Sequence, residues 1–375
     1  MFGWFLSSYE KILANYLVNS IGNHADQKRS RQMKNGRTLQ QLAVELERQL
    51  KTKKDFIADA RDLAMVNGSS LTISGHGSYI VNDLAHEQIG LRTSIPRAYY
   101  EKMQKSAPEL LDENVNHWLH SSDESRMVRT MDGNVRAFLS DRYRPLDNYD
   151  LAEHVLPVIQ QLGCKIESCE LTEKRMYLKC VNDRVQREIT PGDVVQAGII
   201  ISNSEVGCGS VKIEPLVYRL VCKNGLIAND FAMKKYHVGR SGEELGEDRT
   251  SIFYKDRTRK ADDRAFWMKV KDVVEGSLTE AVFYQIVNKM KKAKDVKIEK
   301  DPVKVIESIG KMHLLTEDER SNVLKFLIQG GDLTLYGMVN AITRSAQDVD
   351  SYDRSTELER VGGQVLEMVN VVNPV

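Results

Sequence analysis

Hydrophobic and polar residues alternate most clearly on either side of Asp132-Gly133, within the segment RMVRTMDGNVRAFLSDRYRPLDN. An Asp-Gly pair between two alternating runs predicts a hairpin with a type I′ turn, because that turn needs positive φ at both central residues. A two-residue loop places Arg129 opposite Arg136, with Phe138 on the same face. The other face should belong to the core and carries Val128, Thr130, Val135, Ala137 and Leu139.

Elsewhere the spacing of apolar residues predicts mostly helices, with strands concentrated after the hairpin. The expected helices cover residues 5–21, 38–60, parts of 83–121, 148–163 and most of the chain from 261 onward. The expected strands cover residues 71–73, 79–81, 165–171, 175–181, 194–202 and 210–220. Asp147 or Asn148 can cap the helix after the hairpin, and Thr316 with Glu319 forms a capping-box pattern before another helix.

These elements predict an α+β fold built on one antiparallel sheet of about five or six strands, with a helix packed across it. A helical N-terminal segment and a helical C-terminal region flank that sheet. The expected organisation is an amphipathic helix and basic linker over 1–36, an α+β core over 37–260, and a helical region over 261–375.

Composition limits where a charged ligand could bind. The 375 residues are 41% hydrophobic and 28% charged, and the formal net charge is zero, so any surface for nucleic acid must be a local patch. Five cysteines without a close pair predict free thiols in a reducing cytoplasm. Cys208, in a Gly-Cys-Gly segment, could be a nucleophile, but without an identifiable base a small buried thiol is the preferred interpretation. No membrane span, zinc site or other metal site is predicted.

The two facing arginines of the hairpin are the main candidates for chemistry. Like charges directly opposite one another cost about 0.2–1 kcal/mol, and an anionic partner would offset that cost. Phosphate is the candidate anion, and Phe138 would offer a surface on which a base could stack. Three residues would extend the strip: Arg142, Tyr143 and Arg144. The alternative is that Arg129 and Arg136 meet acidic side chains from another layer or reach water.

A second basic and aromatic cluster follows the strands. Its candidate nucleic-acid-binding residues are Lys234, Lys235, Tyr236, Arg240, Lys255, Arg257 and Arg259. This interleaving suits an arm over a nucleic-acid groove, although two solvated charged loops would have the same composition. Neither phosphate-cradle pattern, GxxxxGKS or GxGxxG after a strand, is present, so we expect no bound nucleotide cofactor and no nucleotide hydrolysis.

Three strings carry a resemblance to a known family: IGLRTSIPRAYYEKM, VRAFLSDRYRPLDNYDL and YDRSTELERVGGQVLE. Together they resemble the phage/plasmid-like protein family known as domain of unknown function nine-three-two, over residues 71–366. Membership implies a bacterial host cytoplasm and a mobile genetic element. The strand, hairpin and helix core also resembles, at the level of fold, single-strand annealing proteins of the Rad fifty-two type.

That second resemblance implies a homo-oligomeric ring or filament that holds single-stranded DNA in a basic groove and consumes no nucleotide. It assigns DNA contacts to Arg136, Phe138, Arg142, Tyr143 and Arg144. The leading hypothesis is therefore a single-stranded DNA-binding and annealing protein of recombination or replication. The alternative is a phage structural or host-interaction oligomer without DNA activity, and an enzyme ranks third.

Overall fold

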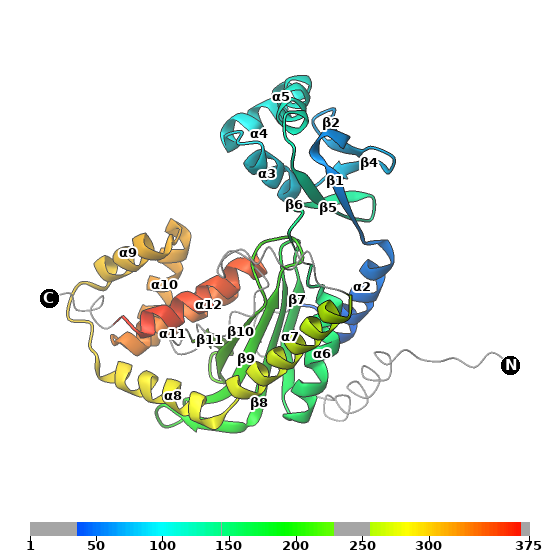
Figure 1. Cartoon of the computed structure of the whole chain (residues 1–375). Helices are drawn as coiled ribbons and strands as arrows, with labels where there is room; N and C mark the ends of the chain where they lie inside the picture. Colours follow the sequence, from blue (N-terminus) through cyan, green and yellow to red (C-terminus); the bar gives the residue numbers. More distant parts are fainter. Residues whose placement is uncertain (1–35, 144, 229–255, 369–375) are drawn as a thin grey trace.

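The computed structural model describes residues 36–143, 145–228 and 256–368. They form a small lobe and a larger body that meet at a narrow junction (Figure 1). Helices and sheets are segregated in both parts, which confirms the predicted α+β class. The predicted N-terminal helix and linker lie outside the described residues, apart from Gly36.

The small lobe is inserted between helices α2 (Leu39–Thr52) and α6 (Asn148–Gln161) of the body. Its sheet has the order β1-β5-β6-β4-β3-β2, in which β4 and β6 are parallel and the other pairs are antiparallel. The strands are β1 Lys54–Asp59, β2 Leu63–Val66, β3 Ser70–Ile73, β4 Gly77–Val81, β5 Ser125–Met131 and β6 Asn134–Ser140. The helices are η2 Ala60–Asp62, α3 Asp83–Arg92, α4 Arg97–Ser106 and α5 Pro108–His120.

The body is built on an antiparallel sheet of order β11-β10-β9-β8-β7. Its strands are β7 Lys165–Leu171, β8 Met176–Glu188, β9 Val194–Asn203, β10 Lys212–Arg219 and β11 Asn224–Ile227. Its helices are α2 Leu39–Thr52, α6 Asn148–Gln161, α7 Asp256–Ser277, α8 Glu280–Asp295, α9 Pro302–His313, α10 Glu317–Gly330, α11 Leu335–Ser345, η5 Ala346–Asp348 and α12 Tyr352–Leu366.

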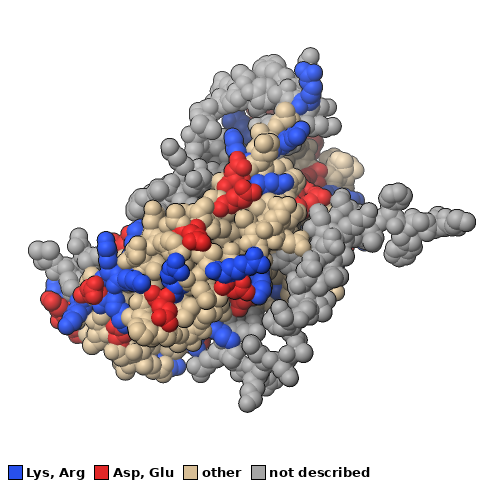
Figure 2. All heavy atoms as spheres, turned by 90° about the horizontal axis from the view of Figure 1, so that it is seen from below, with Lys and Arg blue, Asp and Glu red and all other residues tan. Residues whose placement is uncertain are grey.

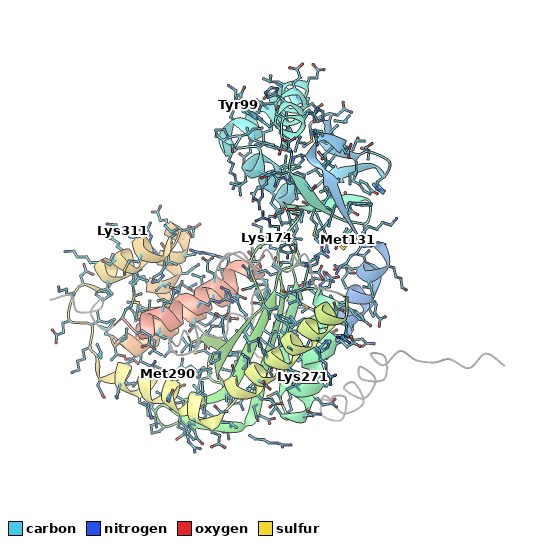
Figure 3. The ribbon with its side chains drawn as sticks, in the orientation of Figure 1. Tyr99, Met131, Lys174, Lys271, Met290 and Lys311 are labelled. Carbon is cyan, nitrogen blue, oxygen red and sulfur yellow. The ribbon has the colours of Figure 1, made fainter. Side chains whose placement is uncertain are left out.

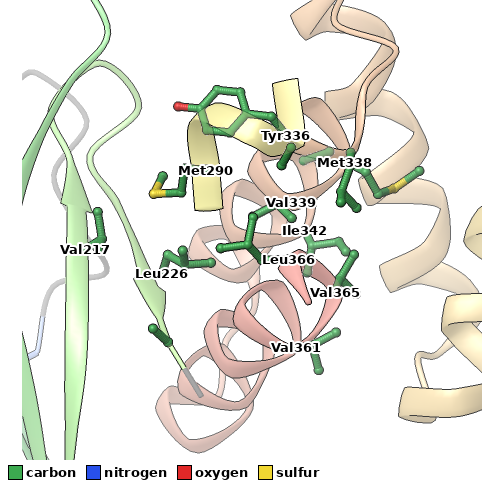
Figure 4. Packing of buried hydrophobic residues seen from close by; sticks show 14 of the residues in the cluster. Val217, Leu226, Met290, Tyr336, Met338, Val339, Ile342, Val361, Val365 and Leu366 are labelled. Carbon is green, nitrogen blue, oxygen red and sulfur yellow. The ribbon is translucent and has the colours of Figure 1, made fainter. Parts of the chain in front are cut away.

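Helices cover both faces of the body sheet because neighbouring strand residues point to opposite sides. Leu178 of β8 lies in an apolar cluster with α2, α6 and α7, whereas the adjacent Lys179 bonds to Glu359 of α12. At the β10–β11 end of the sheet, Val217 and Leu226 join a further cluster with helices α8 to α12 (Figure 4). The sheet of the body is therefore buried on both faces.

Two sequence-based expectations of the fold are wrong. The strands form two separate sheets rather than one, and the hairpin belongs to the sheet of the small lobe. The helix predicted over 38–60 ends at Thr52, and its last part is strand β1, which pairs with the distant β5. Tertiary pairing overrides the local helical pattern there.

The hairpin itself forms as predicted at its turn but not in its register. Asp132 and Gly133 have φ of 54° and 78°, as a type I′ turn requires. A β-bulge then shifts the pairing, so that Thr130 faces Val135 and Arg129 faces Ala137. The two arginines are therefore not directly opposite, and the residues after the bulge are turned to the other face.

Candidate functional site at the lobe junction

The register shift decides where the predicted hairpin site residues lie. Phe138 is fully buried in the apolar core of the small lobe, beside Val128 and Val135. The prediction that Phe138 offers an accessible surface to a base is therefore wrong, because the bulge moves it to the core face. Arg129 and Arg136 are also buried, with 1% and 7% of their surface exposed, and they point into the junction with the body.

Arg129 is held by carboxylates and a carbonyl from three other segments. Its Nε and Nη2 donate to the two carboxylate oxygens of Asp55 at 2.8 and 2.9 Å. Nη2 also donates to Asp147 at 2.8 Å, and Nη1 donates to the carbonyl of Glu205 at 2.7 Å. Burial alone would lower the pKa of Arg129, but the two carboxylates outweigh burial and raise it. Arg129 therefore meets acidic side chains, as the alternative interpretation of the sequence expected.

Glu205 is the centre of the junction. Its Oε1 accepts from Lys53 Nζ at 2.5 Å and from the backbone N–H of Asn148 at 2.6 Å. Its Oε2 accepts from Arg136 Nη1 at 2.5 Å. Burial alone would raise the pKa of this carboxyl, but the charges of Lys53 and Arg136 and their hydrogen bonds outweigh burial and lower it. Glu205 therefore stays ionised and ties the small lobe to the body.

The loop that carries Glu205 follows β9 and makes further contacts with both sides of the junction. Gln88 of α3 donates to the carbonyl of Val206 at 2.7 Å and accepts from the backbone N–H of Phe138, also at 2.7 Å. Tyr143 donates to the carbonyl of Ser204 at 3.2 Å. The loop is thus fixed by the small lobe as well as by its own strand.

Arg136 is not fully paired. Its Nε and Nη2 are buried and have no hydrogen-bond partner within the described residues. Buried guanidinium nitrogens usually find acceptors, since an unpaired buried donor costs about 1–3 kcal/mol. Unlike Arg129, Arg136 therefore retains unused capacity to donate hydrogen bonds.

A pocket of about 200 Å³ lies beside Arg136, between the hairpin and the turn that joins β7 to β8. Its wall is formed by Arg37, Gln49, Asn82, Met131, Arg136, Asn148, Leu171, Thr172, Glu173, Lys174, Arg175, Glu205 and Val206. Figure 3 labels Met131 and Lys174, two residues of the pocket wall, where the small lobe meets the body.

Cationic side chains outnumber carboxylates in this pocket wall. Arg37, Arg136, Lys174 and Arg175 contribute positive charge, and Glu173 and Glu205 contribute negative charge. Arg37 is paired outside the set with Glu170 at 2.9 Å, and Arg175 donates to the carbonyl of Cys208. Lys174 is exposed, and its ammonium has no ion pair within the part of the chain that the structure describes. Such a wall favours an anion.

Of the other predicted binding residues, Tyr143 contacts the junction through the carbonyl of Ser204, but none of those that the structure describes lies in the pocket wall. Arg142 is exposed, Tyr143 is half-buried, and Arg257 is exposed at the start of α7. Burial raises the pKa of Tyr143 and keeps its hydroxyl protonated. Six residues lie outside the described residues: Arg144, Lys234, Lys235, Tyr236, Arg240 and Lys255. Arg259 lies in α7, but its side chain is outside the described set, so the predicted second cluster remains a prediction.

The sequence did not point to most of the residues that build the pocket. Lys174, Arg175 and Glu205 each look like an ordinary surface charge in the sequence, and the partners of Glu205, which are Lys53 and Arg136, lie far away along the chain. The loop SEVGCG, residues 204–209, was the available signal, since its two glycines indicate a tight turn at a strand end.

Two further classes of site can be assessed from the described residues. Within them, no cluster of three or more His, Cys, Asp or Glu side chains is placed to bind a metal ion. Every helix in the same residues is too short or too polar to cross a membrane. Cys208 is half-buried, and burial raises the pKa of its thiol, as expected for a cysteine that is not activated as a nucleophile.

Comparison with known proteins gives one match, to a family model. The family described as Domain of unknown function (DUF932) matches residues 136–361, from Arg136 in the hairpin to Val361 in α12. The match begins at residue 136, whereas the resemblance extended from residue 71, so the match leaves out most of the small lobe. No curated protein and no solved structure matches the chain, so the fold-level resemblance to single-strand annealing proteins gains no support. The matched residues make up more than half of the chain, which therefore belongs to the Domain of unknown function (DUF932) family.

Proposed function

We propose that the protein binds single-stranded nucleic acid at the lobe junction and anneals complementary strands without consuming a nucleotide. The observation that supports this proposal is the surplus of cationic side chains in the junction pocket: Arg37, Arg136, Lys174 and Arg175. A nucleic-acid backbone is a polyanion that such a site would attract, and contacts to phosphate give affinity without sequence preference.

The charge distribution elsewhere supports a local site. Acidic and basic side chains are interspersed on the face of the molecule seen from below (Figure 2). With zero net charge, the chain provides no general attraction for a polyanion. Binding should therefore depend on a few side chains at the junction, and single substitutions there should be measurable.

The test is a fluorescence anisotropy titration of a labelled single strand at several salt concentrations. Lys174→Ala removes an exposed cation of the pocket wall and should weaken binding. It should also reduce the slope of log affinity against log salt by about 0.7, the value for one lost phosphate contact on a single strand. Lys311→Ala is the matched control, because Lys311 is an exposed lysine on α9, far from Lys174 in Figure 3.

Equal loss in both variants would show that binding is non-specific, and no binding by the parent protein would refute the proposal. Annealing is measured separately, by mixing complementary labelled strands without ATP or a divalent metal. We expect faster pairing with the protein than without it, because nothing in the sequence resembles a phosphate cradle for a nucleotide.

A structural or host-interaction oligomer remains the second candidate, supported by exposed apolar residues near α9 and α10. Leu314 and Ile328 are 82% and 68% exposed, and a second subunit could cover them. Light scattering of the parent and of a Leu314→Ser, Ile328→Ser double variant distinguishes the two roles. A smaller particle with unchanged strand binding would assign these residues to assembly alone.

A further inference from the structure

We infer that the junction pocket is a binding site for one terminal phosphate group of the strand, with Arg136 as its principal ligand. This inference rests on the proposed function and makes it more specific, since it names the chemical group that the site recognises. Such a site would recognise the end of a strand, whereas general electrostatic attraction would act on any phosphate of the backbone.

The first observation is the incomplete pairing of Arg136. The side chain is 7% exposed and forms part of the pocket wall. Nη1 is bonded to Glu205, while Nε and Nη2 have no partner among the described residues. Nε and one Nη together form the planar pair of donors that matches two oxygens of a phosphate.

The second observation is that Glu205 does not depend on Arg136 alone for its neutralisation. Lys53 and the backbone N–H of Asn148 both bond to Oε1, on the side of the carboxylate away from Arg136. Arg136 can therefore bind an anion with its remaining nitrogens while Glu205 keeps two other partners. Arg129 offers no such capacity, because each of its nitrogens is already bonded.

The charge of the pocket distinguishes a terminal phosphate from an internal one. Four cationic side chains face two carboxylates in the wall, which leaves an excess of two positive charges (4 − 2 = 2). A phosphate monoester carries a charge of about −1.5 to −2 near pH 7, whereas an internal phosphodiester carries a single negative charge. The monoester therefore matches the excess more closely.

The size of the pocket supports the same choice. Its volume of about 200 Å³ is below the ~300–1,000 Å³ of pockets that enclose a drug-sized ligand. It has room for a phosphate group, and the rest of the strand would extend through its open side. The terminal phosphate of a strand can contact Arg136, while the rest of the strand runs out of the pocket past the exposed Lys174.

The experiment uses the full chain and three labelled strands of one sequence, which carry a 5′-phosphate, a 3′-phosphate or no phosphate. We expect one phosphorylated strand to bind about tenfold more tightly than the unphosphorylated strand, a difference equivalent to about 1.4 kcal/mol. Arg136→Lys keeps the positive charge next to Glu205 but removes the planar donor pair, and it should abolish this preference.

A second measurement keeps the inference testable if Arg136→Lys does not fold. Lys174→Ala alters only an exposed side chain, and it should reduce the preference for the phosphorylated strand. Circular dichroism establishes that each variant is folded. Inorganic phosphate tests whether the pocket binds a phosphate group that is not attached to a strand. It should raise the melting temperature of the parent protein above the value in chloride at equal ionic strength.

The outcomes separate this inference from the proposed function. Equal affinity for all three strands would overturn the terminal-phosphate site while leaving strand binding intact. Stabilisation by inorganic phosphate without binding of any strand would refute the proposed function and assign the pocket to a free phosphate compound. If phosphate does not stabilise the protein and no phosphorylated strand is preferred, the inference that the pocket binds phosphate is wrong.

Discussion

Two clusters of buried charge in this protein differ in how completely they are paired. In the body, Lys179 and Glu359 are both fully buried and bond at 2.6 Å. The second oxygen of Glu359 accepts from Gln347, and the ring of Tyr352 lies 4.9 Å from the ammonium. At the lobe junction, Glu205 is shared by two cations, and Arg136 keeps two unpaired nitrogens beside a pocket.

The comparison shows that burial of charge does not by itself mark a functional site. The Lys179–Glu359 pair joins β8 to α12, and the described residues leave none of its polar atoms unpaired. The pair accounts for the position of α12 against the sheet and gives no reason to expect a ligand there. The junction is buried almost as completely, but Arg136 in its pocket wall retains two buried donors without a partner, which is where a ligand could supply acceptors.

The largest expected effect is that of Glu205→Gln, which leaves Lys53 and Arg136 without a counter-charge. Removal of one partner from a buried ion pair costs about 3–5 kcal/mol, and here two cations lose their partner. Urea unfolding should show a loss of at least that size. Glu173→Gln, at an exposed position in the same pocket, is the control and should change stability little. A loss below about 1 kcal/mol for Glu205→Gln would show that water already solvates the junction.

The next largest effect on stability is expected for the buried Lys179–Glu359 pair of the body. Lys179→Met alone leaves Glu359 buried without its cationic partner, so it should cost about 3 kcal/mol, whereas the double variant with Glu359→Leu should be as stable as the parent or more stable. Urea unfolding measures both variants. Strand binding by the double variant should equal that of the parent. A double variant no more stable than the single one would mean that the pair also determines the packing of α12.

A smaller effect should appear in the pH dependence of stability. The pKa of Glu205 is lower in the folded protein than in the unfolded chain, so its stabilising contribution is complete above the unfolded pKa, near 4.3, and is lost as the pH falls below it. The difference in unfolding free energy between parent and Glu205→Gln should therefore narrow in acid. A difference that is constant with pH would contradict the assignment of Glu205 as the titrating group.

The smallest effect is expected for an exposed pair near the same hairpin. Arg48 of α2 bonds to Asp132 at 2.8 Å and to Glu45 at 2.8 Å, but nearly half of its side chain is exposed. Arg48→Ala should cost about 0.2–1 kcal/mol, and the cost should diminish in high salt. Urea unfolding at two salt concentrations measures it. A larger, salt-independent cost would place this arginine in the buried network.

Features that depend on neighbouring residues could be predicted from the sequence, and features that depend on distant residues could not. The Asp132-Gly133 turn and the capping box of Thr316 form as expected, since both are decided within a few residues. The bulge at Arg136 depends on how β6 packs over the core, so the sequence alone placed Phe138 on the wrong face.

The candidate site was the hardest part to predict. Glu205 lies 152 residues from Lys53 and 69 residues from Arg136 in the sequence, and no local pattern links them. The arginines of the hairpin were identified as unusual for a valid reason, because their charge requires a partner. Arg129 is paired with a set of carboxylates, whereas Arg136 retains an unpaired Nε and Nη2 for an added anion.

The insertion of the small lobe between α2 and α6 also has a consequence for how such a chain could change over evolutionary time. The body completes its own sheet and both of its helical layers without any strand from the lobe. The chain crosses the junction only after Thr52 and before Asn148. The lobe is therefore attached at two chain crossings and through side chains around the Glu205 loop, so a different lobe would need to match those contacts rather than a whole sheet edge.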